Sequence, residues 1–292
     1  MSTIWRDWDS DTNATDLPLG DDMDKTTKSS PFDIAMQHRQ GETMDMVRTA
    51  LARKQVKLAF QPVVQTAQPD KMAFYEGLLR VADEQGRIIP AKDFIDVVDN
   101  TDMGRQLDAL ALEKGIEALF EEASLRLSIN MSALTIGYAQ WNDVLKKGLK
   151  KDPTVGERLI IEITERTALS APDEVRDFMT DLQNKGISFA LDDFGAGYTS
   201  FKYLKDFYFD IIKIDGELIQ GVHDDPDAQI LTEALLDLGH KFDMFVVAEN
   251  VETFEDAEFL TSIGMDCMQG YYFGVPTLTP YWQVNKLLGR TA

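Results

Sequence analysis

The sequence is short of cysteine, of histidine and of positive charge. Its 292 residues include one cysteine, Cys267, and three histidines, His38, His223 and His240. A single cysteine excludes an intramolecular disulfide framework and is compatible with a reducing compartment. The 29 Lys and Arg residues face 50 Asp and Glu residues, so the formal net charge is −21. We therefore expect no binding to polymeric nucleic acid or to an anionic membrane, because the long-range force is repulsive.

Long apolar runs are also missing. No stretch approaches the roughly 20 apolar residues that cross a bilayer, and the N-terminus has no basic segment followed by an apolar core. The sequence therefore predicts a soluble cytoplasmic protein without a membrane partner.

Residues 1–40 differ in composition from the rest of the chain. They are rich in Asp, Ser and Thr and poor in aliphatic residues, so we expect an acidic, flexible N-terminal tail. Residues 41–292 form the expected folded domain. A closed α/β barrel typically needs about 250 residues, which this segment provides.

From residue 41 the chain alternates helical patterns with short β-rich runs. Helical spacing marks residues 41–55, 105–123, 174–186, 227–242 and 253–264. The β-rich runs are 56–64, 72–81, 125–132, 158–164, 187–193, 209–215, 244–250 and 265–272. Several runs are almost continuously apolar, which is typical of parallel strands covered on both faces. About eight such strands favour an α/β fold of the (β/α)8 TIM-like barrel type.

Local signals support these boundaries. Ser170 precedes Asp173 by three residues, with Pro172 between them, which predicts a capping box at the start of a helix. Gly186 and Gly264 stand where two helices are expected to end. No G-x-G-x-x-G turn follows the first strand, which argues against a dinucleotide-binding fold.

Most of the β-rich runs carry a polar residue near their carboxyl end. In a barrel these ends meet at one face, so side chains far apart in sequence converge there. A single acid at such a position is more often a helix cap or a solvated loop residue, but its recurrence on strand after strand favours a site. The residues are Glu76, Asn130, Glu162, Asp192, Asp193, Lys213, Glu249 and Gln269.

This set of oxygen donors predicts divalent cations. Several buried carboxylates are too costly to keep charged without positive charge among them. All-oxygen ligation favours Mg²⁺ or Mn²⁺ over Zn²⁺, and none of the three histidines lies at a predicted strand end. Two such ions, with one of the two adjacent aspartates bridging them and the other binding only one, would offset the repulsion between Asp192 and Asp193. Two-metal sites hydrolyse phosphate esters, so this is the chemistry we expect.

Two cationic residues accompany the predicted site. Lys213 is expected to position water or stabilise charge on phosphorus, and a salt bridge to Asp215 is the alternative. Arg80 is expected to hold a phosphate group, and a surface arginine is the alternative.

Taken together, these motifs resemble the EAL-domain phosphodiesterases, which hydrolyse the bacterial second messenger cyclic di-GMP. The resemblance covers about residues 42–280, and its landmarks keep the order and spacing of the family. They read FQPVV, YEGLLR, LSINMS, IEITE, LDDFGAGYTS, IIKID, VVAENVET and MQGYYFG.

The resemblance implies a barrel whose first strand is antiparallel to its neighbours, and an enzyme that converts cyclic di-GMP to linear pGpG with two ions of Mg²⁺ or Mn²⁺. By motif, the implied metal ligands are Glu76, Asn130, Glu162, Asp192, Asp193 and Glu249.

The remaining site residues are also implied by the resemblance. Lys213, Glu249 and Gln269 match catalytic positions, and Gln61, Leu78 and Arg80 match positions that contact the dinucleotide. Glu165 resembles a residue that braces the loop after the double aspartate, where Gly195 and Gly197 let the backbone turn. The family also implies a homodimer formed near residues 194–206.

The sequence departs from the family pattern at four places. The signature reads Glu-Gly-Leu because Gly77 replaces alanine, Ala196 replaces threonine, and Asn250 replaces glycine. Residues 97–102 read VVDNTD where Ala-Glu-Glu-Thr-Gly is usual. None of these changes removes an implied metal ligand, which favours an active enzyme.

Other functions compete with this hypothesis. A catalytically silent EAL module would bind cyclic di-GMP as a receptor, and degenerate members usually lose a ligand or the loop glutamate. An enolase-type barrel uses similar residues but expects a capping domain, for which about 40 polar residues leave no room. A purely structural protein would not explain the costly charges at one barrel mouth. A regulatory partner protein is not identified by any motif.

Overall fold

The computed structural model describes residues 30–196 and 204–287. The chain divides into two compact units, residues 1–39 and 40–292, which we describe separately. Helix α1 (Pro31–Ala52) begins in the first unit and continues into the second. Residues 31–40 of the expected flexible tail are therefore helical, and residues 1–29 lie outside the described part of the chain.

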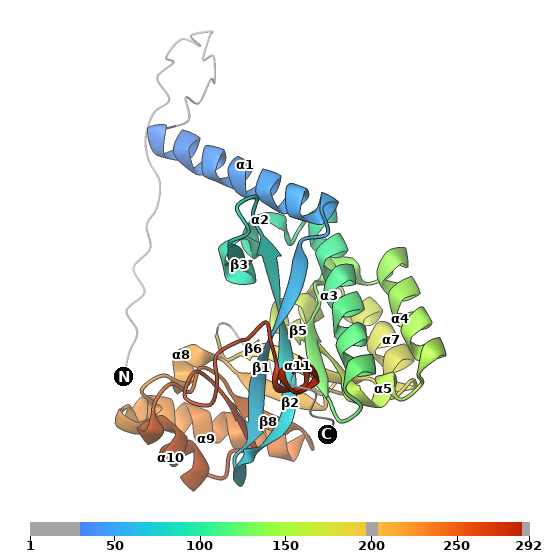
Figure 1. Ribbon diagram of the computed structural model, residues 1–292. Coiled ribbons are helices and arrows are strands. Elements are labelled where there is room, and N and C mark those ends of the chain that lie inside the picture. The colour runs from blue at the N-terminus through green and yellow to red at the C-terminus, as the bar shows by residue number, and fades with distance from the viewer. Residues whose placement is uncertain (1–29, 197–203, 288–292) are drawn as a thin grey trace, which may run out of the picture. The chain divides into compact units, whose positions relative to one another are not determined.

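The second unit contains a nine-stranded sheet, and all of its strands except β3 (Ile88–Pro90) close into a ring (Figure 1). The strands of the ring are β1 (Val56–Gln65), β2 (Gln68–Ala82), β4 (Leu127–Asn130), β5 (Leu159–Thr164), β6 (Ser188–Phe194), β7 (Ile211–Ile214), β8 (Phe245–Ala248) and β9 (Cys267–Gln269). The predicted eight-stranded barrel is thus confirmed.

Strand β1 closes the ring and runs against both of its neighbours. It pairs antiparallel with β2 and with β9, whereas each other pair of neighbours in the ring is parallel. The reversed first strand that the family resemblance implied is therefore present. The parallel strand β7 is buried along its whole length, because one face points into the barrel and the other meets helices.

Helices lie outside the ring, α3, α4 and α7 on one side and α8, α9 and α10 on the other (Figure 1). The longer ones are α3 (Asp102–Glu121), α4 (Ala139–Lys151), α7 (Pro172–Gln183), α9 (Pro226–Lys241) and α10 (Phe254–Ser262). The shorter ones are α2 (Ile95–Val98), α5 (Val155–Arg158), α6 (Glu165–Ser170), α8 (Gly216–Ile219) and α11 (Tyr281–Leu287). Three 3₁₀ turns are described as well: η1 (Ala91–Asp93), η2 (Ala133–Thr135) and η4 (Val222–Asp224). Within the described residues, no helix is both long enough and apolar enough to cross a membrane.

The predicted start of α7 is partly wrong. Pro172 occupies the first turn as expected, but Ala171 is the N-cap and gives no side-chain cap. The Ser170 hydroxyl instead donates a hydrogen bond to the carbonyl oxygen of Thr167, at 2.8 Å, within the preceding helix. Ser170 is thus the last residue of the short helix α6 and does not cap α7.

One apolar layer fills the interior of the barrel toward the amino ends of its parallel strands. Its residues come from seven different strands, so they can meet only inside the ring. They are Val63, Phe74, Ile160, Ala190, Ile211, Val247 and Cys267. On β4 the corresponding residue is Ser128, which is fully buried and pairs in register with Ile160. Because side chains of a strand alternate between its faces, the next interior layer lies two residues further along each strand.

Candidate active site

The second interior layer is polar on every strand. Two residues beyond the apolar layer, toward the carboxyl ends, the seven parallel strands contribute Glu76, Asn130, Glu162, Asp192, Lys213, Glu249 and Gln269. On the reversed strand β1 the same step runs backward, from Val63 to Gln61. The alternation of the strands therefore builds a ring of polar side chains directly above an apolar floor.

Lys213 lies at the centre of this polar layer. Its side chain is 1% exposed, and its Nζ lies 2.7 Å from Glu249 Oε1 and 2.9 Å from Glu162 Oε2. Asp192 Oδ1 is 3.0 Å away and Glu76 Oε2 is 3.5 Å away. One ammonium group is thus shared by carboxylates from four different strands, which confirms that these residues converge.

The alternative partner for Lys213 is not used. Asp215 is the N-cap of α8, and its carboxylate accepts a hydrogen bond from the backbone N–H of Glu217 at 2.8 Å. Lys213 therefore points into the barrel, while Asp215 caps the helix after β7.

Glu76 links the remaining polar residues of the layer. The Asn130 amide donates a hydrogen bond to Glu76 Oε1 at 2.9 Å, and the Gln269 amide donates to Glu76 Oε2 at 2.6 Å. Gln269 also donates to Gln61 Oε1 at 3.3 Å, and Gln61 in turn donates to the carbonyl oxygen of Gly274 at 3.2 Å. These contacts fix the orientation of the signature glutamate.

Burial and mutual repulsion strongly perturb the charges of this layer. Burial raises the pKa of Glu162 to about 8, against the opposing effect of Lys213, and it raises the pKa of Glu249 well above its ordinary value. Burial also acts to raise the pKa of Glu76, but Lys213 and the amides of Gln269 and Asn130 hold it below its ordinary value. Burial acts to lower the pKa of Lys213, but the surrounding carboxylates together raise it well above its ordinary value. One ammonium does not neutralise so many acids, so the layer favours further positive charge.

The double aspartate depends on an irregular strand end. Successive side chains of a regular strand point to opposite faces, which would separate Asp192 from Asp193. The pairing of β6 with β7 shifts register between Leu191 and Phe194, and Asp193 has a left-handed backbone with a φ of 56°. As a result, carboxylate oxygens of Asp192, Asp193 and Glu249 lie within 4.8 Å of one another. Burial, with repulsion from Asp192, raises the pKa of Asp193 to about 6.

The donors of this layer fit a divalent cation. Glu162 Oε1 and Gln269 Oε1 are buried and accept no hydrogen bond from the described residues. Together with the cluster of Asp192, Asp193 and Glu249, they offer only oxygen atoms, as Mg²⁺ and Mn²⁺ prefer. The sequence prediction of an oxygen-ligated metal centre is compatible with this arrangement.

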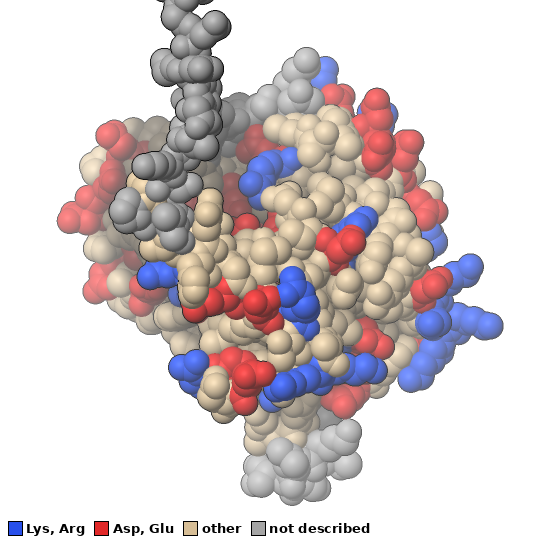
Figure 2. Space-filling view, turned by 90° about the horizontal axis from the view of Figure 1, so that it is seen from above, with Lys and Arg blue, Asp and Glu red and all other residues tan. Residues whose placement is uncertain are grey.

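A cavity of about 450 Å³ opens above the polar layer. Of the predicted site residues, Leu78, Asn130, Glu162, Asp192 and Asp193 line it. This volume is typical of small-molecule sites, which favours a substrate of nucleotide size. On the face seen in Figure 2, acidic side chains lie recessed in a hollow and basic side chains stand beside them.

Seven predicted site residues do not line the cavity: Glu76, Lys213, Glu249 and Gln269 of the polar layer, and Gln61, Arg80 and Glu165. Gln61 belongs to the buried hydrogen-bond chain, and Arg80 is half-buried, with its guanidinium donating to the carbonyl oxygen of Leu79 at 2.8 Å. Glu165 lines a neighbouring hollow with Asp193 and Ala196. Residues 197–203, which include Gly197 and the loop that Glu165 was expected to brace, lie outside the described part of the chain.

Sequence reasoning did not identify four charged residues that line the cavity. Asp108 projects from the buried face of α3, where its carboxylate accepts hydrogen bonds from Ser132 N at 3.0 Å and Thr135 Oγ1 at 2.6 Å. The other three are Asp96, Asp99 and Arg166. An aspartate among the apolar residues of a buried helical face was the available signal for Asp108.

Two residues that follow strands near the site have a left-handed backbone, and in both cases the residue type suits this conformation. Asn250, which replaces a glycine of the family pattern, has a φ of 53°, the left-handed conformation that asparagine tolerates better than most residues. Gly195 has a φ of 100° at the turn after the double aspartate. Both positions therefore need left-handed backbone beside Glu249 and Asp193.

Comparison with known proteins places these observations in a family. The family model of the EAL domain matches residues 44–276. MucR of Pseudomonas aeruginosa, described as a bifunctional diguanylate cyclase/cyclic di-GMP phosphodiesterase, is 30% identical over 84% of this chain and 37% of its own length. The cyclic di-GMP phosphodiesterase PdeL of Escherichia coli is 30% identical over 80% of this chain and 66% of its own. The chain thus spans about a third of the length of the first curated relatives that it matches.

Solved structures agree with the family match. The PaMucR phosphodiesterase in complex with c-di-GMP is 30% identical, with a TM-score of 0.72 over 83% of this chain and 99% of the other. The FimX EAL domain from Pseudomonas aeruginosa bound to c-di-GMP, at 24% identity and a TM-score of 0.74 over 82% of this chain and 97% of the other, shares the fold. The barrel with its reversed first strand, the polar layer above its floor and the match over residues 44–276 lead to one conclusion: this chain belongs to the EAL domain family.

Proposed function

We propose that this protein is a metal-dependent phosphodiesterase that hydrolyses cyclic di-GMP to linear pGpG. The observation that carries the proposal is the set of oxygen donors in the polar layer, because that layer, with Asp193 beside it, contains every metal ligand implied by the family motif. The relatives named as cyclic di-GMP phosphodiesterases support the choice of substrate.

The polar layer supplies the ligands for two ions of Mg²⁺ or Mn²⁺. The residues that would hold them are Glu76, Asn130, Glu162, Asp192, Asp193 and Glu249. Bound ions of this kind supply an acidified water molecule and neutralise negative charge on a phosphate group.

The protein side chains orient and balance this centre. Lys213 holds the carboxylates of Glu162, Asp192 and Glu249 together, and its ammonium is a proton donor within the polar layer. Gln269 fixes Glu76 through a hydrogen bond to Oε2 and, through its own amide oxygen, can orient a water molecule. Lys213, Glu249 and Gln269 are therefore the proposed catalytic side chains.

The substrate occupies the cavity above the polar layer in this proposal. Leu78 gives an apolar contact at its wall. Gln61 and Arg80, which do not line the cavity, are the other proposed contacts of the dinucleotide. Glu165 is proposed to brace the segment after Asp193.

The wider setting is also part of the proposal. We propose a cytoplasmic role in bacterial second-messenger signalling, with no membrane or polymeric nucleic acid partner and with a regulatory partner of unknown identity. A homodimer through residues 194–206 is proposed from the family resemblance, and residues 197–203 of that segment lie outside the described part of the chain.

The test is incubation of the purified protein with cyclic di-GMP and Mg²⁺ or Mn²⁺, followed by chromatographic detection of pGpG. Addition of EDTA should abolish product formation. Glu76→Gln should lower turnover by more than about 100-fold, since loss even of groups behind a metal ligand costs about 10- to 100-fold. Glu174→Gln, at an exposed position of α7, is the matched control and should leave turnover unchanged.

Two results would redirect the proposal. Tight binding of cyclic di-GMP without any pGpG would identify a receptor instead of an enzyme. Product formation that survives both EDTA and Glu76→Gln would refute the role of the polar layer.

A further inference from the structure

The cavity has a marked imbalance of charge. Its lining includes six acidic residues, namely Asp96, Asp99, Asp108, Glu162, Asp192 and Asp193. Among the described residues that line it, Arg166 is the one that carries a positive charge. A substrate with two phosphate groups therefore meets a single protein cation along these walls.

Arg166 is placed at the mouth of the cavity, and most of its side chain is exposed to solvent. It is the second residue of α6, four residues after Glu162 of the polar layer. Its side chain is 85% exposed, and its closest charged partner, Asp99 Oδ2, is 3.7 Å away. Arg166 also lines the neighbouring hollow that Asp193 and Ala196 share. Breaking a long, exposed ion pair of this kind costs little free energy, so the guanidinium group can exchange Asp99 for a phosphate group.

We propose that Arg166 is a substrate-positioning residue that binds a phosphate group of the cyclic dinucleotide. The inference rests on the proposed function and adds to it a specific contact. Cations in the polar layer would neutralise the phosphate that reacts, whereas the second phosphate of a cyclic dinucleotide lies away from that layer and needs its own partner. A guanidinium group binds phosphate oxygens through two parallel hydrogen bonds, which suits this task.

The position of Arg80 strengthens this assignment. Its guanidinium already donates to the carbonyl oxygen of Leu79, and Arg80 does not line the cavity. Arg166, in contrast, lines the cavity, and its only described ion pair is with Asp99, another residue of the lining. Its guanidinium group is therefore within reach of a ligand in the cavity.

The experiment compares Arg166→Ala and Arg166→Lys with the wild-type protein. The Michaelis constant for cyclic di-GMP should rise about tenfold in Arg166→Ala while kcat stays within about twofold, the loss expected for a charge-assisted hydrogen-bond pair that is equal in ground state and transition state. Arg166→Lys should recover part of the loss. The dissociation constant of cyclic di-GMP, measured in EDTA, should rise by a similar factor.

The matched control is Arg176→Ala on α7. Arg176 is also exposed and paired with an aspartate, Asp173, but it does not line the cavity, so both constants should stay unchanged. Unchanged constants in Arg166→Ala, an equal change in Arg176→Ala, or a fall in kcat alone would overturn the inference. If wild-type protein neither binds nor hydrolyses cyclic di-GMP, the proposed function fails first and this inference fails with it.

Discussion

Gly77, the residue after the signature glutamate, has no room for a side chain. A Cβ atom placed there would lie 2.6 Å from Ile129 Cδ1 and 3.2 Å from the carbonyl oxygen of Ser128. Ile129 Cδ1 would also lie 3.0 Å from a Cβ atom at Gly115 of α3. The side chain of Ile129 on β4 therefore fills the space that Gly77 and Gly115 leave. The surroundings of Gly77 thus suit glycine instead of the alanine of the family signature.

We expect Gly77→Ala to destabilise the protein by about 1–3 kcal/mol, the usual cost of overpacking a core. Ile129→Val, which removes Cδ1, should cost about 0.5–1.5 kcal/mol on its own. In the double variant the two changes should compensate, so its loss should be smaller than the sum of the single losses. Urea unfolding of the four proteins measures this coupling, and strictly additive losses would show that Ile129 does not set the requirement for glycine.

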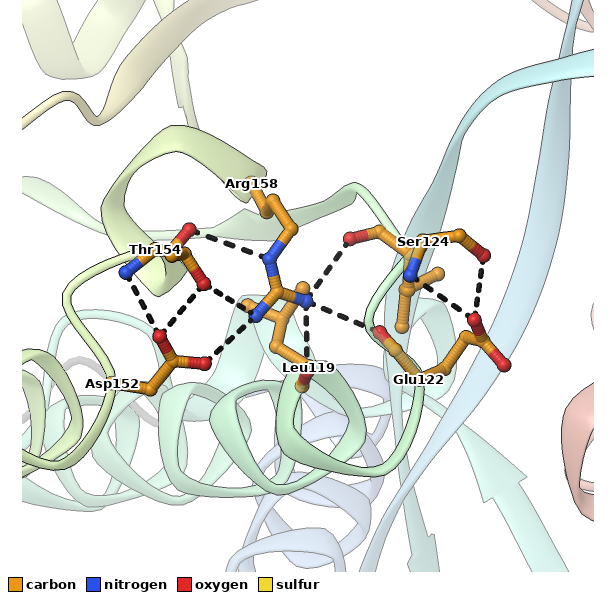
Figure 3. Close-up of polar contacts among 7 residues, drawn as sticks. Leu119, Glu122, Ser124, Asp152, Thr154 and Arg158 are labelled. Atoms are coloured by element: carbon orange, nitrogen blue, oxygen red, sulfur yellow. Dashed lines mark hydrogen bonds and ion pairs between the residues drawn. The ribbon is translucent and has the colours of Figure 1, made fainter.

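At the scale of the elements, Arg158 ties the end of α3 to the start of β5 (Figure 3). Its Nη1 donates to the carbonyl oxygens of Leu119, at 2.8 Å, and Glu122, at 3.1 Å, where the carbonyls of α3 lack helical partners. Its Nη2 donates to Asp152 Oδ2 at 3.2 Å and to Thr154 Oγ1 at 3.3 Å. One guanidinium thereby joins three segments that precede the strand of Glu162.

Arg158→Ala should lower the free energy of unfolding by about 2–4 kcal/mol, because it leaves the carbonyl oxygens and Asp152 without their donor. Arg158→Lys should restore only part of this loss, since an ammonium lacks the planar fork of donors. Thermal and urea unfolding report the change. Lys114→Ala, which removes an exposed ion pair with Glu117 on the same helix, is the control and should change stability by less than about 0.5 kcal/mol.

Asp108 links α3 to η2 by hydrogen bonds, and its contribution to the stability of the protein depends on pH. Its carboxylate accepts hydrogen bonds from Ser132 and Thr135, yet burial raises its pKa from 3.8 to about 6. The folded state thus holds a proton more tightly than the unfolded state does. Stability from this group is present below about pH 4, falls as the pH rises toward 6, and stays reduced above that.

Asp108→Asn should therefore stabilise the protein at pH 7–8 by an amount on the order of 2–3 kcal/mol. An amide oxygen can still accept both hydrogen bonds and carries no charge to desolvate. Below about pH 4 the advantage should vanish. Urea unfolding at several pH values gives the difference between variant and wild type, and a difference that is independent of pH would contradict the assignment.

The alternation of side chains along the strands made most of the polar layer predictable from the sequence. Glu162, Lys213 and Gln269 were found because each is a polar residue at the end of an apolar run, and a barrel brings such ends together. The same reasoning could not foresee how Asp193 shares a site with Asp192, since this depends on a left-handed residue and a register shift that no pattern encodes.

Other features needed the folded chain because they arise between elements. Arg166 comes after a strand end like many surface arginines, and only the packing of α6 beside the cavity gives it a role. Helix α4 was not among the predicted elements, although Trp141 and Leu145 are spaced by one helical turn and are both buried. Its Gly148 packs against Ile116 of α3, where a Cβ atom would lie 2.8 Å from Ile116 Cδ1, so this contact requires a small residue.

At the scale of the whole molecule, the net charge of −21 opposes the approach of an anionic substrate. Exposed charges are screened beyond about 8 Å at physiological ionic strength, whereas cations in the polar layer and Arg166 act at contact distance. The association rate constant of cyclic di-GMP should therefore rise a few-fold between about 20 and 150 mM salt. Stopped-flow measurements with a fluorescent analogue test this, and a strong slowing with salt would mean that local cations dominate the approach.

The central claim is that the polar layer is a centre for divalent cations, and a calorimetric titration with Mn²⁺ tests it most directly. Asp193 lies outside the buried core with a left-handed φ of 56° that suits asparagine, so Asp193→Asn should fold, and Asp173→Asn at an exposed position of α7 is the control. The account predicts two Mn²⁺ ions per wild-type chain, an unchanged titration for Asp173→Asn, and one site lost or strongly weakened in Asp193→Asn. No saturable binding by the wild-type protein, or binding that Asp193→Asn leaves intact, would contradict it.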